Sequence, residues 1–326
     1  MKILVVGGAG YIGSHMVREL IDKGFDPLVY DNLSTGHSWA VPEGSLIEGD
    51  LADTAALNRL FETVNIRAVM HFASSIQVAE SVVEPLKYYR NNVANTLNLL
   101  AAMRQNGVKR IVFSSTAAVY GSPLSVPISE QAPLNPENPY GRSKLMVEQV
   151  LADCDHAWGL KSAVLRYFNA AGAHPSAAIG EAHTPESHLI PIMLQVASGR
   201  RESVTIYGTD YPTRDGTCIR DYIHVCDLAS AHSLALEALL DDSGSFVCNL
   251  GNGLGYSIQE VMEVGRAVTG HPIPVSIGQR RPGDPALLVA SADKMRSEFG
   301  WKPRFADLPS IIGTAWKWHQ NNGYGF

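Results

Sequence analysis

The chain contains 326 residues, of which 45% are hydrophobic and 18% charged, with 29 glycines and 18 prolines spread along it. This composition excludes collagen-like, low-complexity and disordered proteins, and the length predicts about two domains with a substantial core. The formal net charge is −6, with 26 Lys and Arg against 32 Asp and Glu and no dense basic block, which argues against a nucleic-acid or anionic-membrane binder.

Short apolar runs bounded by turn residues predict buried strands in the first half of the chain. Stretches long enough for a helix separate them, so we expect βαβ units with helices on both faces of a parallel sheet. The predicted strands are Ile3–Val6, Leu28–Tyr30, Ala68–Phe72, Ile111–Ser114 and Ala163–Tyr167. The predicted fold class is therefore α/β, a doubly wound parallel sheet of the Rossmann type.

The first predicted strand runs directly into a glycine-rich turn, Gly7-Gly-Ala-Gly10-Tyr-Ile-Gly13, followed by a helical segment. Glycine lets the backbone approach a pyrophosphate, and the start of the helix directs N–H groups at it. The alternative is a tight turn without a ligand, because a glycine motif alone is weak evidence. An acidic residue, Asp31, 18 positions after Gly13, favours a dinucleotide site.

Asp31 ends the second predicted strand, where its carboxylate would accept from an adenosine 2′-hydroxyl and repel a 2′-phosphate. No basic residue stands at positions 32–36, so the sequence favours NAD over NADP. The alternative for Asp31 is a turn or cap within the segment that ends at Gly36, which is compatible with ligand binding. Asp50-Leu51 either faces adenine or begins the next helix, and the sequence does not decide between the two.

A long amphipathic helix is predicted from Pro85 onward, because apolar residues recur at three- and four-residue steps and form one stripe. The stripe consists of Leu86, Tyr89, Val93, Leu97, Leu100 and Met103. Asn91 lies in this helix beside the stripe.

Tyr140 and Lys144 follow Pro136 and Pro139, and a proline at a helix start predicts a new helix that carries both on one face. A neighbouring ammonium and an oxidised nicotinamide would both favour phenolate, lowering the phenol's pKa from near 10 toward general-base chemistry. Thr116 follows a predicted strand, at the carboxyl edge where ligands bind in such sheets. The alternative for all three is an ordinary helix or loop role, which the preceding dinucleotide turn disfavours.

Beyond Asn169 the chain becomes rich in Gly, Pro, His and Ser and loses the alternating βα pattern. We therefore predict a NAD-binding domain over residues 1–169 and a smaller α/β substrate-binding domain over residues 170–326. The apolar piece Phe246–Leu250, in the segment near 221–250, is a candidate to return to the first sheet.

The chain resembles the extended short-chain dehydrogenase/reductase family, and within it the UDP-hexose 4-epimerases, over nearly its whole length. The motifs that carry the resemblance are Gly7-Gly-Ala-Gly-Tyr-Ile-Gly-Ser-His15, Asp31-Asn-Leu33, His71-Phe-Ala73, Tyr88-Tyr-Arg-Asn-Asn92, Tyr140-Gly-Arg-Ser-Lys144, Arg166-Tyr-Phe-Asn169, Arg220-Asp-Tyr-Ile-His224 and Arg281-Pro-Gly-Asp284. Several of these motifs are weak alone, and together in this order they are specific.

The resemblance implies two sets of binding residues. The implied NAD contacts are Gly7, Gly10, Tyr11, Ile12, Gly13, Asp31, Asn32, Leu33, Ser34, Thr35, Gly36, Asp50, Leu51, Phe72, Ala73, Asn91, Tyr140, Lys144 and Phe168. The implied UDP-sugar contacts are Thr116, Asn169, His188, Leu189, Tyr207, Arg220, Arg281, Asp284 and Leu288. The two arginines suit a diphosphate or, alternatively, a surface ion pair, and Arg166 is interpreted as structural.

The resemblance implies reversible, NAD-dependent epimerisation of UDP-glucose and UDP-galactose at carbon 4. Tyr140, assisted by Lys144 and Thr116, takes the proton of the sugar 4-hydroxyl while hydride passes to NAD, and the 4-keto sugar rotates before the hydride returns. The cofactor is regenerated in each turnover and is expected to stay tightly bound. The resemblance also implies a homodimer joined through long helices of the first domain. The helix predicted at Leu86–Met103 is a candidate, and the alternative is that its apolar positions belong to the internal core.

Related enzymes that dehydrate or decarboxylate nucleotide sugars carry an acidic residue just after the position of Thr116. This chain has Ala117-Ala118 there, so elimination lacks its proton-transfer group. A UDP-glucuronate 4-epimerase or decarboxylase is the alternative enzyme, although no partner for the sugar carboxylate is identified. A dinucleotide-sensing regulatory protein is the non-enzyme alternative, and such proteins commonly lack the Tyr and Lys.

Three residues depart from the family pattern. Thr116 replaces Ser and His188 replaces Asn, and both changes keep hydrogen-bonding ability. Leu288 matches a position beside the sugar's 2-substituent, where Tyr restricts the pocket and a small residue admits N-acetyl groups. Leu is intermediate, which predicts partial activity on UDP-N-acetylhexosamines unless Leu288 only packs against a neighbouring strand.

The four cysteines, Cys154, Cys218, Cys226 and Cys248, form neither a C-x-x-C pair nor a metal-ligand spacing. We expect no metal site and no disulfide framework. The N-terminus does not resemble a secretory signal, and no run approaches the roughly 18 apolar residues of a membrane span. The sequence therefore predicts a soluble, cytoplasmic protein.

Overall fold

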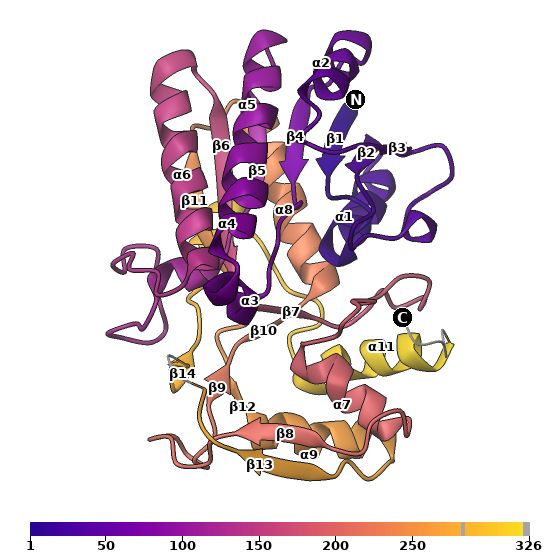
Figure 1. Cartoon of the computed structure of the whole chain (residues 1–326), viewed down its shortest axis with the longest axis vertical. Coiled ribbons are helices and arrows are strands. Elements are labelled where there is room, and N and C mark those ends of the chain that lie inside the picture. Colours follow the sequence, from indigo (N-terminus) through magenta and orange to yellow (C-terminus); the bar gives the residue numbers. More distant parts are fainter. Residues whose placement is uncertain (282–283, 322–326) are drawn as a thin grey trace.

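The computed structural model describes residues 1–281 and 284–321. Its central element is a seven-stranded parallel sheet in the order β11-β6-β5-β4-β1-β2-β3 (Figure 1). The strands are β1 (Lys2–Val6), β2 (Asp26–Asp31), β3 (Leu46–Glu48), β4 (Ala68–His71), β5 (Arg110–Ser114), β6 (Lys161–Tyr167) and β11 (Phe246–Leu250). The doubly wound prediction is confirmed, and the strand order reverses between β1 and β4, where such folds bind ligands.

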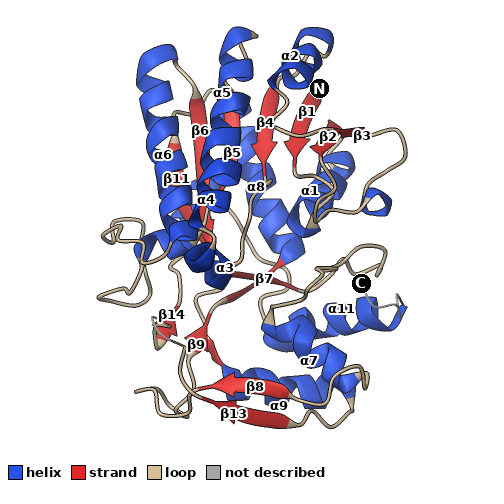
Figure 2. Cartoon of the chain, in the orientation of Figure 1, coloured by secondary structure: helices blue, strands red, loops and turns tan. Residues whose placement is uncertain are grey.

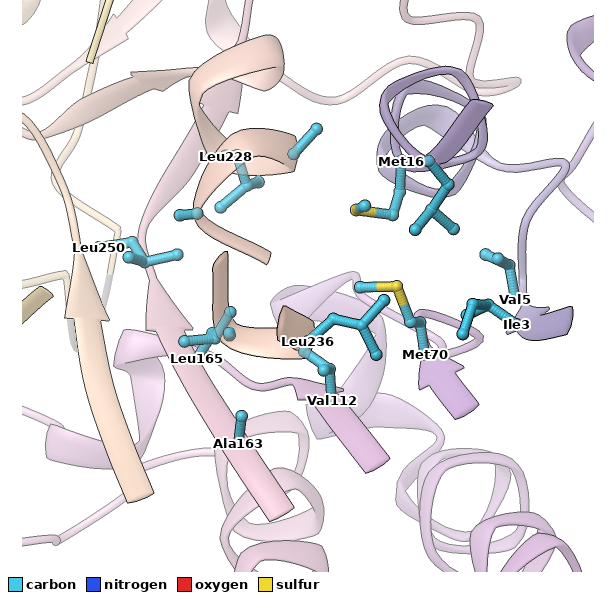
Figure 3. Close-up of a cluster of buried hydrophobic side chains, with 14 of the residues drawn as sticks. Ile3, Val5, Met16, Met70, Val112, Ala163, Leu165, Leu228, Leu236 and Leu250 are labelled. Atoms are coloured by element: carbon cyan, nitrogen blue, oxygen red, sulfur yellow. The ribbon is translucent and has the colours of Figure 1, made fainter. Parts of the chain in front are cut away.

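Helices cover both faces of this sheet (Figure 2). One face packs against α1 (Tyr11–Asp22) and α8 (Val225–Leu240), and the other against α2 (Thr54–Thr63), α5 (Asn95–Gln105) and α6 (Pro139–Trp158). Side chains alternate along β1: Ile3 and Val5 join the cluster beneath α1 and α8, shown in Figure 3, while Leu4 and Val6 join the other. Each strand is apolar on both sides because both of its faces are buried.

The segment Phe246–Leu250 lies far along the chain yet belongs to the first sheet. It forms β11, which pairs in parallel with β6. The preceding helix, α8, supplies Leu228 and Leu236 to the cluster in Figure 3. The domain boundary at residue 169 remains a prediction.

A second core lies below the sheet in Figure 1, built mainly from α7 (Leu189–Ala197), α9 (Ile258–Thr269) and α11 (Leu308–Asn321). The smaller strands and helices are β7 (Asn169–Ala171), β8 (Val204–Tyr207), β9 (Ile219–Arg220), β10 (Tyr222–His224), β12 (Tyr256–Ser257), β13 (Val275–Gly278), β14 (Leu287–Leu288), α3 (Val78–Val83), α4 (Pro85–Tyr88) and α10 (Asp293–Phe299). Among the described residues, no helix has the length and apolar character needed to cross a membrane.

The segment after Pro85 differs from the single amphipathic helix predicted for it. A π-helical stretch, Tyr89–Ala94, separates α4 from α5 and shifts the face that turns inward. Leu86 and Leu97 of the predicted stripe are 64% and 46% exposed, whereas Leu100 and Met103 are buried. Polar residues take the inner positions instead: Asn92 donates to Ser143 Oγ at 3.0 Å, and Thr96 bonds His71 Nε2 at 2.8 Å.

Four histidines are buried in the fold and are expected to make stability depend on pH. Burial lowers the pKa of His71 and of His224 to about 3 and that of His15 and of His232 to about 4. As the pH falls below about 6.5, the unfolded chain binds protons first, so each histidine costs the folded state about 1.4 kcal/mol per pH unit.

We expect the free energy of unfolding in urea to fall from pH 7 to pH 5 by about 2 kcal/mol for each of these histidines. A His232→Gln variant cannot take up that proton, so the same change should be about 2 kcal/mol smaller than in the wild type. Equal pH dependence in the two proteins would contradict a neutral His232.

Candidate active site

The glycine turn after β1 is packed so closely that side chains cannot enter it. Gly7 has a φ of +77°, and a Cβ there would lie 2.4 Å from the Ala73 nitrogen. A Cβ on Gly13 would lie 2.2 Å from the Gly7 carbonyl oxygen. Helix α1 starts after Gly10, which provides no side-chain cap, so its first N–H groups are available to an anion. This cradle fits a dinucleotide pyrophosphate.

We expect Gly13→Ala to damage this turn, because the added methyl meets backbone atoms that cannot move aside. Overpacking of this kind costs about 1–3 kcal/mol of stability, and we expect at least a tenfold loss of retained dinucleotide. Gly313→Ala is the matched control, because a Cβ there meets nothing within 4 Å and Gly313 lies within α11. Equal dinucleotide content of the two purified variants would contradict this role of Gly13.

Asp31 ends β2 and holds the same turn together. One carboxylate oxygen accepts from the Ala9 N–H and the other from the Leu33 N–H, both at 2.9 Å. Asp31 therefore has the turn role that was the alternative to ribose binding. Its place at the end of β2 is also the one expected for a residue that binds the adenosine ribose. Asp50 accepts from Asn32 Nδ2 at 2.7 Å, so it belongs to the same edge.

Helix α2 does not begin at Asp50. Its N-cap is Asp53, whose carboxylate accepts from the Ala56 N–H at 2.9 Å. Of the two possibilities left open for Asp50-Leu51, the start of a helix is therefore wrong.

The predicted cofactor residues gather where strands of the sheet end. Gly7 follows β1, Phe72 and Ala73 follow β4, and Phe168 follows β6. Ser34, Thr35 and Gly36 follow β2, and Thr35 lines a small pocket with Gly10 and Tyr11. The carboxyl ends of parallel strands meet at one edge, so these residues lie along the same edge of the sheet. Ile12 lies in the first turn of α1, and Asn91 Nδ2, from the π-helical stretch, donates to Ser75 Oγ at 3.1 Å.

Tyr140 and Lys144 lie one turn apart at the start of α6, as predicted. Asn138 caps the helix by accepting from the Gly141 N–H at 2.8 Å, and Pro139 is its first residue. The Lys144 ammonium donates to the Ser114 carbonyl at 2.9 Å and lies 4.9 Å from the centre of the Phe113 ring. These bonds fix Lys144 beside the end of β5.

Burial controls the titration of this pair. It raises the pKa of the Tyr140 phenol, and a side-chain hydrogen bond with Thr116 opposes the rise. It also lowers the pKa of Lys144 to about 7, against the attraction of Glu148. The predicted lowering of the phenol's pKa by Lys144 is not found, because Lys144 is not among the groups that shift it and desolvation is the largest cause. A cation bound beside the phenol would have to supply the missing stabilisation of phenolate.

Glu148, one turn beyond Lys144, is a residue that the sequence reasoning missed. It forms a buried ion pair with Arg166, whose Nε lies 3.1 Å from Glu148 Oε1, and it accepts from the Ser115 hydroxyl. Arg166 Nη1 also donates to the Tyr120 hydroxyl at 2.9 Å. The structural role predicted for Arg166 is confirmed. The signal in the sequence was that Glu148 follows Lys144 by four residues, which places the two side chains on one face of the helix.

The predicted substrate residues of the second part of the chain include two arginines and their neighbours. Arg220 pairs with Asp284, and the Arg281 guanidinium carbon lies 4.0 Å from the centre of the Tyr207 ring. Leu288 is in β14, which pairs in parallel with β9, where Arg220 lies. Asn169 Nδ2 donates to the Asp221 carbonyl at 2.9 Å. Pro282 and Gly283 of the Arg281–Asp284 motif lie outside the described residues.

His188, predicted as a uridine-side contact, precedes the first residue of α7, Leu189, and lies beside two glutamates. Its Nδ1 lies 2.8 Å from Glu181 Oε1 and 2.9 Å from Glu186 Oε1. His183 Nδ1 lies 3.1 Å from the same Glu181 oxygen. Counting the cysteines could not reveal this group, whereas the alternation of Glu and His from 181 to 188 could have.

A sequence model of the NAD dependent epimerase/dehydratase family matches residues 3–251 of the chain. A protein of Halalkalibacterium halodurans named UDP-glucose 4-epimerase is 53% identical over 326 residues, covering 100% of this chain and 98% of its own. The crystal structure of UDP-glucose 4-epimerase from Brucella ovis in complex with NAD is 49% identical, with a TM-score of 0.95 and 97% of each chain covered. That from Bifidobacterium longum, in complex with NAD+ and UDP, is 41% identical, with a TM-score of 0.94 and 100% of each chain covered.

Proposed function

Because the chain belongs to the NAD dependent epimerase/dehydratase family, we propose that it interconverts UDP-glucose and UDP-galactose by NAD-dependent epimerisation at carbon 4. The observation that carries the proposal is the placement of Tyr140 and Lys144 on one turn of α6, next to Thr116 and the carboxyl ends of β4 and β5. A base and a dinucleotide crevice at one sheet edge suit oxidation of a secondary alcohol.

The glycine turn is the part of the chain that fits NAD. Gly7 and Gly13 let the backbone of the turn pack closely, and the first N–H groups of α1, which no side chain caps, are available to a pyrophosphate. Asp31 lies at the end of β2 for the adenosine ribose. When bound, NAD supplies reversible hydride chemistry at the sugar's carbon 4 and a positive charge when oxidised.

Tyr140 takes the proton of the sugar 4-hydroxyl and later returns one to the same oxygen. Thr116 assists as a neighbour of the phenol whose side chain opposes the rise of its pKa. Lys144, held by the Ser114 carbonyl, contributes a hydrogen-bond donor and, when protonated, a positive charge beside the phenolate. The pair therefore moves the proton while the carbon is oxidised and reduced again.

The arginines of the second part hold the UDP group. Arg220 and Arg281 carry permanent positive charge and can each donate two parallel hydrogen bonds to a diphosphate. Asp284, paired with Arg220, keeps that guanidinium in place. Holding the nucleotide through its diphosphate leaves the sugar free to turn and present either face to the same base.

The test is incubation of the purified protein with UDP-galactose and no added cofactor, followed by chromatography of the products and extraction of bound nucleotide. The proposal predicts UDP-glucose and about one NAD per chain. Absence of UDP-glucose from a protein that retains NAD would contradict this substrate assignment.

The pocket at Leu288 is expected to admit a 2-acetamido group in part. Leu288 is half-buried and packs against the cluster around Ala117, as Phe168 does, and we propose that its side chain limits space beside the sugar. We expect measurable turnover of UDP-N-acetylglucosamine, at least tenfold below UDP-galactose in kcat/KM. Leu288→Tyr should lower kcat/KM for UDP-N-acetylglucosamine, relative to kcat/KM for UDP-galactose, by a further tenfold. No UDP-N-acetylglucosamine turnover by the wild type, where UDP-galactose reacts well, would contradict the prediction.

Two further properties belong to the proposal. Apolar side chains on α3, α4, α5 and α6 are exposed, among them Val83 at 76% and Leu86 at 64%, and we propose that they form a homodimer interface.

The four cysteines are free thiols, which is consistent with a reducing cytoplasm.

A further inference from the structure

Residues 181–188, between β7 and α7, bring two glutamates and two histidines together outside the site of chemistry. One ligand atom from each of Glu181, His183, Glu186 and His188 lies within 4.8 Å of the other three. We infer that these side chains bind one divalent transition-metal ion, and that Zn²⁺ fits them best.

The distances within this Glu–His cluster lie on both sides of those expected for a tetrahedral site. Zinc bonds to imidazole nitrogen and carboxylate oxygen are about 2.0–2.1 Å long, which places tetrahedral ligand atoms about 3.3 Å apart. His188 Nδ1 lies 2.8 and 2.9 Å from oxygens of Glu181 and Glu186, and His183 Nδ1 lies 3.1 and 4.0 Å from oxygens of the same two residues. Small side-chain movements would bring all four atoms to bonding distance of one ion.

Burial and charge favour a cation in the Glu–His cluster. The side chains of Glu181 and Glu186 are only 6% and 4% exposed, and two neighbouring buried carboxylates require positive charge between them. The histidines are 21% and 40% exposed, which provides a route of entry for an ion. Two imidazole ligands favour zinc and its neighbours over Mg²⁺ and Ca²⁺, which prefer oxygen.

Further bonds hold the ligands in place, as in built metal sites. Glu186 Oε1 accepts from the backbone N–H groups of Ser187 and His188 at 2.7 and 2.8 Å. The Glu181 carbonyl accepts from the Trp318 indole at 3.1 Å, which ties the segment to α11.

The cluster also lies against the nucleotide turn. The His183 ring is 6.3 Å from the Tyr11 ring, centre to centre, and the Ala182 carbonyl accepts from His37 Nε2 at 2.8 Å. A bound ion would therefore fasten residues 181–188 over the start of α1. Resting on the proposed function, this predicts faster loss of NAD from the metal-free protein.

The test uses the full-length protein after treatment with EDTA and gel filtration. Titration with Zn²⁺ alone in a calorimeter should show one ion per chain and a rise in Tm, and Co²⁺ should give the visible absorption bands of a tetrahedral complex. His183→Ala and Glu181→Gln should each weaken Zn²⁺ binding at least tenfold. His156→Ala, which removes an exposed histidine of α6, is the matched control and should bind as the wild type does.

Wild-type binding that is weaker than millimolar, or that exceeds one ion without a change in Tm, would overturn the inference and leave an ion-pair cluster. Binding by His183→Ala and Glu181→Gln equal to that of the wild type would overturn it as well. These measurements involve no turnover, so their failure is distinguishable from failure of the proposed epimerase activity.

Discussion

Tyr140→Phe is expected to lower kcat for UDP-galactose by about 10²–10⁴-fold, the usual contribution of a positioned general base. The phenol's oxygen is the group that exchanges the proton with the sugar, and phenylalanine keeps the ring that packs edge-on against Tyr88, 6.5 Å away. Retained NAD and Tm should therefore stay near the wild-type values. Steady-state kinetics, nucleotide extraction and thermal unfolding of the same preparation check the three expectations together.

Tyr89→Phe is the matched control, since Tyr89 lies in the π-helical stretch and carries no assigned role in the reaction. We expect its kcat to stay within about threefold of the wild type. A Tyr140→Phe protein with wild-type turnover would exclude Tyr140 as the base of the reaction.

Glu148→Ala is expected to give the largest loss of stability, about 3–5 kcal/mol, because it leaves the Arg166 charge buried without a partner. The two side chains are only 5% and 7% exposed, and the Ser115 hydroxyl also donates to Glu148. The loss should appear in urea unfolding as a lower midpoint with an unchanged slope.

Glu237→Ala removes the partner of an exposed ion pair with Lys23 and is the matched control. Such surface pairs contribute about 0–1 kcal/mol. If Glu148→Ala and Glu237→Ala lowered the free energy of unfolding by the same small amount, the buried Glu148–Arg166 pair would stabilise the protein no more than a surface pair does.

The sheet could be predicted because its strands carry their own signal. Ile3–Val6 and Ala163–Tyr167 are buried on both faces, so continuous apolar runs marked them directly. The glycine turn could also be predicted from the sequence, because Gly7 and Gly13 occupy positions that no side chain can enter. Asn138 and Pro139 likewise mark the start of α6, and with it the placement of Tyr140 and Lys144.

What could not be predicted depends on contacts between distant segments. The π-helical stretch at Tyr89–Ala94 exposes Leu86, and only the packing of polar Asn92 against Ser143 reveals which face turns inward. The pKa of Tyr140 is set mainly by its burial, which its place at a helix start does not indicate. Arg220 forms an ion pair with Asp284, which is 64 residues further along the chain. Residue spacing does not predict contacts over such a separation.

The most direct test of the account uses UDP-galactose labelled with deuterium at carbon 4 and the protein with its retained cofactor only. Oxidation and reduction at the same carbon by one bound cofactor predict UDP-glucose that keeps the deuterium at carbon 4, measured by mass spectrometry and NMR. Replacement of that deuterium by solvent hydrogen would contradict hydride return at carbon 4 and require a different chemistry at Tyr140.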